Sequence, residues 1–212
     1  MIVQIVGRRS SMFTRMPLIF AEELGLPYEL TPIYDMTELG PEVYAGNPAL
    51  KLPILRTQGS ELFGAHNICR AIAERADKPA RIGWPEDLRD DLSRNAQELV
   101  WHCMTAQVQL IMGIAVGKLP ADNVYFTKAR AGLENSLRWL DSNVARALSS
   151  LPLPRDLSSF EVSLFCLVDH LVFRATVPVE PYPSLVSFAK EFSKKSSAQR
   201  TVYRFDTRPT DS

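Results

Sequence analysis

The stretch that decides the fold is KLPILRTQGSELFGAHNICRAIAE, residues 51–74. Its apolar and β-branched runs predict two short strands, at 52–55 and 60–63. A helix follows at 66–76, where the apolar residues recur every three or four positions. Two strands leading into an amphipathic helix are typical of an α/β unit.

The residues before this stretch extend the same pattern. Residues 2–6, IVQIV, predict a further strand, and a helix of roughly 15–24 is expected to end at Gly25, which tolerates positive φ. Residues 1–77 are therefore predicted to form one α/β domain.

The period changes after a segment rich in proline and glycine, residues 78–87. Apolar residues spaced by three and four along 92–114 and 126–148 predict two long antiparallel helices. Ser158, with Glu161 three positions later, predicts the capped start of a third helix, and 184–194 predicts a last one. Residues 88–212 are expected to form an all-helical domain.

Composition limits the classes of partner. The 212 residues are 46% hydrophobic, and 24 Lys and Arg balance 24 Asp and Glu, so no charge block suits nucleic acid. The longest apolar runs fall short of the roughly 20 residues of a membrane span, and the first residues lack the order of a secretory signal, so we expect a cytoplasmic protein. Cys69, Cys103 and Cys166 show no metal-ligand spacing, and no metal is expected.

Several motifs resemble the glutathione S-transferase superfamily. They are SSMFTR at 10–15, GNPALKLPIL at 46–55, the helix cap at Ser158 and the tail beginning YPSLVSF at 182. The resemblance implies a thioredoxin-like α/β domain at 1–77, a linker at 78–87 and an all-helical domain at 88–212. It also implies a homodimer, with glutathione as co-substrate and a small hydrophobic second substrate.

The resemblance implies where glutathione would bind. A cis bond at Leu52–Pro53 would let the Leu52 backbone pair with the cysteinyl part of the ligand, whereas a plain strand-starting proline is the alternative. The backbone amides of Ala65, His66 and Asn67 open a helix, and a helix N-terminus attracts a carboxylate. The family carries Glu-Ser or Gln-Ser where this chain has Gly64-Ala65. Because hydrogen bonds to charged groups contribute about 1.5–3 kcal/mol each, this loss predicts weakened binding.

The resemblance also implies that Ser11 would activate the thiol, with Ser10 as the alternative. Lowering a thiol pKa by about two units takes roughly 2.7 kcal/mol, which is within reach of one hydroxyl hydrogen bond and a helix N-terminus. A serine that only caps the helix is the competing interpretation. Because Pro17 fits best in a first helical turn, a helix start near Thr14 is also considered.

The helical half would supply the second-substrate pocket, for which the candidates are Trp101, Met104, Gln107 and Ile111. The leading hypothesis is a transferase that activates glutathione, or a related thiol, for conjugation to or reduction of an electrophile. The alternative is a non-catalytic ligand-binding or protein-interaction module with a decayed glutathione site. A peroxidase or oxidoreductase using a protein cysteine is disfavoured, since no cysteine follows the first strand.

Overall fold

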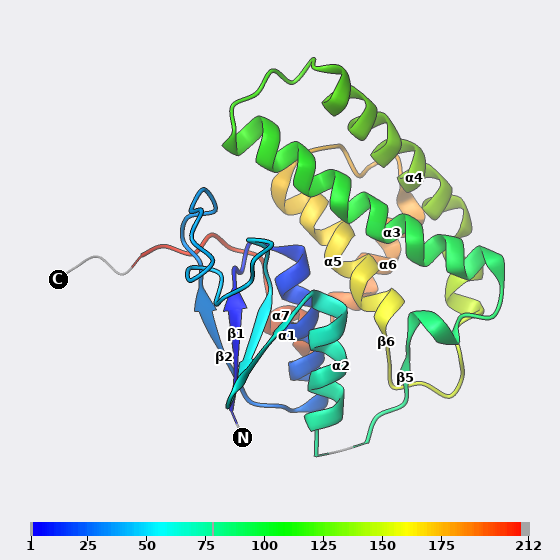
Figure 1. The fold of residues 1–212 in the computed structure, drawn as a ribbon. Coiled ribbons are helices and arrows are strands. Elements are labelled where there is room, and N and C mark those ends of the chain that lie inside the picture. The colour runs from blue at the N-terminus through cyan, green and yellow to red at the C-terminus, as the bar shows by residue number, and fades with distance from the viewer. Residues whose placement is uncertain (1, 78, 209–212) are drawn as a thin grey trace. The chain divides into compact units, whose positions relative to one another are not determined.

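The structure, a computed structural model, describes residues 2–77 and 79–208, and the chain divides into two units. One unit comprises Met1–Ala80 and Lys194–Ser212, and the other comprises Arg81–Ser193. The first is a thioredoxin-like sheet with helices and the second is helical, as the sequence predicts (Figure 1).

The first unit contains a four-stranded sheet in the order β2-β1-β3-β4. β1 and β2 are parallel, and β3 is antiparallel to both β1 and β4. The strands are β1 Val3–Gly7, β2 Tyr28–Pro32, β3 Ile54–Thr57 and β4 Ser60–Phe63. Helices α1 Met12–Leu24 and α2 Ala65–Arg75 pack against each other beside the sheet (Figure 1).

The segment between β2 and β3 builds a small core of its own. Successive strand residues point to opposite faces, so Val6 faces away from its buried neighbour Ile5. Val6 and Ile54 form a buried cluster with Ile33, Tyr44 and Ala45. The irregular segment that carries Tyr44 therefore covers this end of one sheet face.

Residues 194–208 group with the first unit, whereas the predicted helical domain was 88–212. The physical reason is Arg15 of α1, whose side chain is buried and needs acceptors. Its Nη2 donates to the carbonyl of Ala198, 3.1 Å away, and its Nε donates to Oγ1 of Thr201 at 3.3 Å. These contacts dock a short helix, α7 Ser196–Arg200, against α1 (Figure 1).

The second unit is built on α3 Asp91–Leu110 and α4 Val124–Ser149, which pack along each other. The two predicted long helices are confirmed. α3 continues as a π-helix, η2 Ile111–Val116. The other two helices, α5 Ser159–Arg174 and α6 Pro183–Phe192, complete the unit by packing on α3 and α4 respectively. Ser158 caps α5 by accepting from the Glu161 amide at 3.4 Å, as predicted.

The predicted linker is structured from Arg81 onward and groups with the second unit. A short strand, β5 Ile82–Gly83, pairs in parallel with β6 Leu157–Ser158, and a 3₁₀ turn, η1 Pro85–Asp87, follows. An ion pair joins the residues that precede these two strands, since Nη2 of Arg81 lies 2.8 Å from Oδ1 of Asp156.

Among residues 2–77 and 79–208, one helical run, Asp91–Val116, is long and apolar enough to cross a membrane. It has 26 residues, and its most apolar window has a mean hydropathy of 1.5. The same run packs on α4 and α5. One such helix is weak grounds for a membrane span.

Candidate functional site

Strand register brings three predicted segments to one end of the sheet. Val6, near the end of β1, pairs with Ile54 at the start of β3, and Ile54 pairs with Phe63 at the end of β4. Three segments therefore meet there. They are the turn after β1 that carries Ser11, the Leu52–Pro53 bond before β3, and the start of α2 at Ala65.

Ser11 is the N-cap of α1, and its Oγ accepts a hydrogen bond from the Thr14 amide at 3.3 Å. Ser11 therefore caps α1, and a helix start near Thr14 is wrong because α1 begins at Met12. Capping does not exhaust the hydroxyl, which has one donor hydrogen and two acceptor lone pairs. Its O–H can still donate to an anion such as a thiolate.

The turn before Ser11 is tightly held against α1. The Ser11 amide donates to the carbonyl of Arg8 at 3.1 Å, and the Arg8 amide donates to Oγ1 of Thr14 at 3.3 Å. A Cβ on Gly7 would lie 2.6 Å from the Thr14 side chain, so the close approach of β1 to α1 requires glycine here. Thr14 thus fixes the turn from the helix side.

The Leu52–Pro53 bond is cis, as the resemblance implies. The segment leading to it is fixed by Asn47, which is 5% exposed. Nδ2 of Asn47 donates to the carbonyl of Lys51 at 2.7 Å, and its Oδ1 accepts from the Ala49 amide at 3.0 Å. The asparagine of the GNP motif therefore positions the backbone that would pair with a peptide ligand.

The start of α2 presents backbone amides without a side-chain cap. Its N-cap is Gly64, at φ 90° and ψ 135°, and no side chain of the described residues caps it. The side chain of Ala65 is buried, whereas Asn67 donates from Nδ2 to the carbonyl of Phe63 at 3.1 Å. His66 lies on the same turn and is partly buried. Uncapped N–H groups at the positive end of a helix dipole suit a carboxylate.

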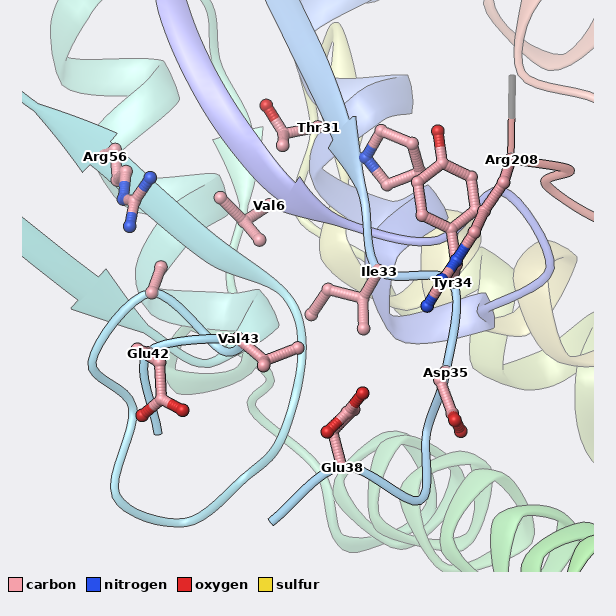
Figure 2. Close-up of a pocket in the computed structure, with 12 residues that line it drawn as sticks. Val6, Thr31, Ile33, Tyr34, Asp35, Glu38, Glu42, Val43, Arg56 and Arg208 are labelled. Carbon is pink, nitrogen blue, oxygen red and sulfur yellow. The ribbon is translucent and has the colours of Figure 1, made fainter. Parts of the chain in front are cut away.

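A cavity of about 300 Å³ lies near this end of the sheet, on the face covered by the segment after β2. Val6 and Ile33 line its floor, and Arg56 and Arg208 lie on opposite sides of it, with Asp35 nearer Arg208 (Figure 2). Its lining includes none of the predicted site residues. The mixed charges suit a zwitterionic or polar group rather than an apolar one.

The helical unit places the four predicted second-substrate residues along α3 and the first residue of η2. Trp101 and Ile111 are partly buried, and Met104 and Gln107 are fully buried. The Gln107 side chain pairs with Nδ1 of His170 at 3.2 Å and accepts from the Thr176 hydroxyl at 2.6 Å. Gln107 therefore has a polar role inside the helical unit.

Cys103, also on α3, has a thiol whose pKa burial raises to about 12. Such a thiol is protonated at neutral pH and is a poor nucleophile. Cys103 is therefore a poor candidate for the reactive cysteine of a peroxidase or thiol oxidoreductase.

Sequence reasoning missed two residues that bear on the turn, Arg9 and Asp206. Oδ2 of Asp206 accepts from the Arg9 amide at 2.8 Å, and Oδ1 lies 2.7 Å from Nη1 of Arg9. The two residues are 197 positions apart, so no local pattern joins them.

Comparisons with known proteins agree with this geometry. The family model described as the glutathione S-transferase N-terminal domain matches residues 10–75. A search of curated proteins gave no match.

Solved structures match along almost the whole chain. A glutathione S-transferase from Methylobacillus flagellatus KT with glutathione bound is 18% identical, covers 95% of this chain and all of its own, and has a TM-score of 0.74. A family member from Pseudomonas fluorescens Pf-5 with bound glutathione is 19% identical, covers 95% and 99%, and has a TM-score of 0.73. One from Methylobacterium radiotolerans JCM 2831, in complex with glutathione sulfonate, is 18% identical, covers 100% and 99%, and has a TM-score of 0.72.

A thioredoxin-like unit with a cis-proline segment at the sheet end, joined to a helical unit, defines the class of fold. That fold is the glutathione S-transferase fold, and the resemblance to the superfamily is confirmed.

Proposed function

We propose that this protein binds glutathione, or a closely related thiol, at the sheet end of its first unit and activates it for reaction with a small electrophile. The observation that carries the proposal is the convergence of Ser11, the cis Leu52–Pro53 bond and the uncapped start of α2. The glutathione-bound structures of proteins with the same fold support it.

Each part of the site meets one part of the ligand. The Leu52 backbone pairs with the cysteinyl residue, and the amides of Ala65, His66 and Asn67 receive the γ-glutamyl carboxylate. The Ser11 hydroxyl donates to the thiolate, which holds the thiol pKa down. The thiolate sulfur then forms a bond to the electrophilic carbon, and the leaving group departs with its electron pair.

The proposal also covers the second substrate, the oligomeric state and the cellular compartment. The second substrate is a small hydrophobic electrophile. Of the four predicted contacts, Trp101 and Ile111 are the accessible candidates, whereas Met104 and Gln107 are fully buried inside the helical unit. The assembled form is a homodimer, which sedimentation would test. The reducing cytoplasm, where glutathione is abundant, is the compartment that fits.

The test is calorimetric titration with millimolar glutathione, with γ-glutamyl-alanyl-glycine as a ligand that lacks the thiol. We expect both to bind, and only glutathione to show thiolate absorbance near 240 nm at neutral pH. If neither ligand binds and neither raises the melting temperature, the proposed function is wrong.

A non-catalytic module is the second candidate, and the residues Gly64 and Ala65 favour it, because neither offers a polar side chain. Ala65→Ser distinguishes the two by adding a hydroxyl without altering Gly64, whose positive φ strains any other residue. A decayed site predicts no binding in wild type and measurable binding in Ala65→Ser. Strong binding by wild type would eliminate the decayed-site candidate.

A further inference from the structure

The residues after α7, 201–208, return along the first unit to the turn that carries Ser11, and we call them the tail. The tail is anchored first at α1. The guanidinium carbon of Arg15 lies 4.2 Å from the centre of the Tyr203 ring, and Arg15 also donates to Thr201. Tyr203 is 6% exposed, so this contact is largely shielded from water.

Asp206 is the tail residue that reaches the turn. Its side chain is 2% exposed, and each carboxylate oxygen accepts from Arg9, one from the backbone amide and one from the guanidinium. A buried carboxylate bonded to a backbone amide and paired with a guanidinium is a strong, directional contact. It fixes both the backbone and the side chain of Arg9.

The amides of the turn show why this contact matters. The Arg8 amide donates to Thr14, the Ser11 amide donates to the carbonyl of Arg8, and the Arg9 amide donates to Asp206. Thr14 therefore holds the turn from α1, and Asp206 holds it from the tail.

The tail then continues past the turn to the segment after β2. The guanidinium of Arg208 lies 5.9 Å from the centre of the Tyr34 ring and lines the cavity described above (Figure 2). The tail thus contacts α1, the Ser11 turn and the segment after β2 in succession.

We propose that the tail is a strap that orders the turn between β1 and α1, and that Asp206 is a positioning residue for Ser11, acting through Arg9. The positioning role rests on the proposed function, whereas the ordering of the turn does not. Without Asp206 the Arg9 amide loses its acceptor, the turn opens more often, and Ser11 no longer donates to the thiolate from a fixed place.

Hydrogen exchange tests the ordering of the turn directly. Amides of residues 7–13 are followed by mass spectrometry in wild type, Asp206→Ala, Asp206→Asn and Arg200→Ala. Arg200 is a matched control because it pairs with Glu22 at 3.0 Å, near the other end of α1. We expect exchange at 7–13 to quicken about tenfold in Asp206→Ala, less in Asp206→Asn, which keeps an acceptor oxygen, and not in Arg200→Ala. Unchanged exchange in Asp206→Ala would contradict the proposal that the tail orders the turn between β1 and α1.

The thiolate spectrum tests the positioning role. In Asp206→Ala with bound glutathione, the pH midpoint of thiolate absorbance should rise, and Asp206→Asn should recover part of the shift. Faster exchange with an unchanged midpoint would leave the strap standing and refute the positioning role. If wild type shows no thiolate signal, both the proposed function and the positioning role are refuted. The exchange result would still show whether the tail orders the turn.

Discussion

Ser11 performs two tasks with one hydroxyl, and different substitutions separate them. As N-cap it accepts from the Thr14 amide, and as the proposed thiol activator it donates its hydrogen. Aspartate caps a helix about as well as serine but has no hydrogen to donate when ionised. Threonine retains both the acceptor and the donor.

We predict three distinct outcomes at position 11. Ser11→Ala should lose about 1 kcal/mol of stability and the thiolate signal, because it removes both the cap and the donor. Ser11→Asp should keep the stability and lose the thiolate signal, and Ser11→Thr should keep most of both. Denaturant unfolding and thiolate absorbance measure the two properties separately. A normal thiolate signal in Ser11→Asp would exclude the hydroxyl as the activating group.

Asp156 gives a pH-dependent prediction in the helical unit. Hydrogen bonds from the side chain and the backbone of Arg81 lower the pKa of Asp156 to about 2. Because the folded-state pKa lies below the reference of about 3.9, the contribution to stability is present above about pH 4. It is lost as the pH falls toward 2.

We therefore expect the melting temperature of wild type to fall more steeply between about pH 4 and pH 2 than that of Asp156→Asn. Above pH 5, Asp156→Asn should be the less stable of the two, since it lacks the ion pair. Asp122→Asn, at an exposed site before α4, is the control. Parallel curves for wild type and Asp156→Asn would show that the Arg81 contact does not stabilise the fold.

At the scale of elements, two glycines of the helical unit give opposite predictions. A Cβ on Gly113, in η2, would overlap the buried ring of Phe126, whereas a Cβ on Gly132, in α4, would meet no atom within 4 Å. Gly113→Ala should therefore lower stability by about 1–3 kcal/mol through overpacking. Gly132→Ala should raise it by up to about 1 kcal/mol through helix propensity.

Thermal and denaturant unfolding of the two variants would check this pair. The two substitutions add the same methyl group, so they share any effect of composition on the unfolded chain. Equal effects on stability would mean that the contact between η2 and Phe126 is not tight.

The elements also show how far the sequence alone could reach. Long apolar periods predicted α3 and α4, and the Ser158 cap fixed the start of α5. The first helix starts at Met12 rather than near 15, and β3 starts at Ile54 rather than at 52, because Pro53 cannot donate to a strand. β5, β6 and α7 are too short to show a period.

The candidate site was predictable in unequal parts. The start of α2 follows from helix signals. Ser11 as the thiol activator and the cis bond at Leu52–Pro53 came from the resemblance, since most X–Pro bonds are trans. The contact of Asp206 with Arg9 could not be predicted, because it depends on how the tail folds back over 197 positions. Long-range contacts of this kind leave no local signal.

At the scale of the whole molecule, the first unit is discontinuous in sequence. Its sheet and two helices come from the beginning of the chain, and α7 and the tail come from the end. Chain ends that dock in this way bury side chains such as Tyr203 and give Arg15 its acceptors. Burying an aromatic side chain removes about 150–250 Å² from water, worth roughly 4–6 kcal/mol before opposing entropic and polar costs.

We predict that a chain ending at Ser193 loses several kcal/mol of stability in the first unit and little in the second. Hydrogen exchange should quicken in residues 2–77, most strongly in α1, and stay close to wild type in α3, α4 and α5. A chain ending at Arg208 is the control, because it keeps α7 and every described tail contact. Equal quickening in both units would show instead that the chain unfolds as one cooperative body, in which case the last residues stabilise the helical unit as much as the sheet to which they are bonded.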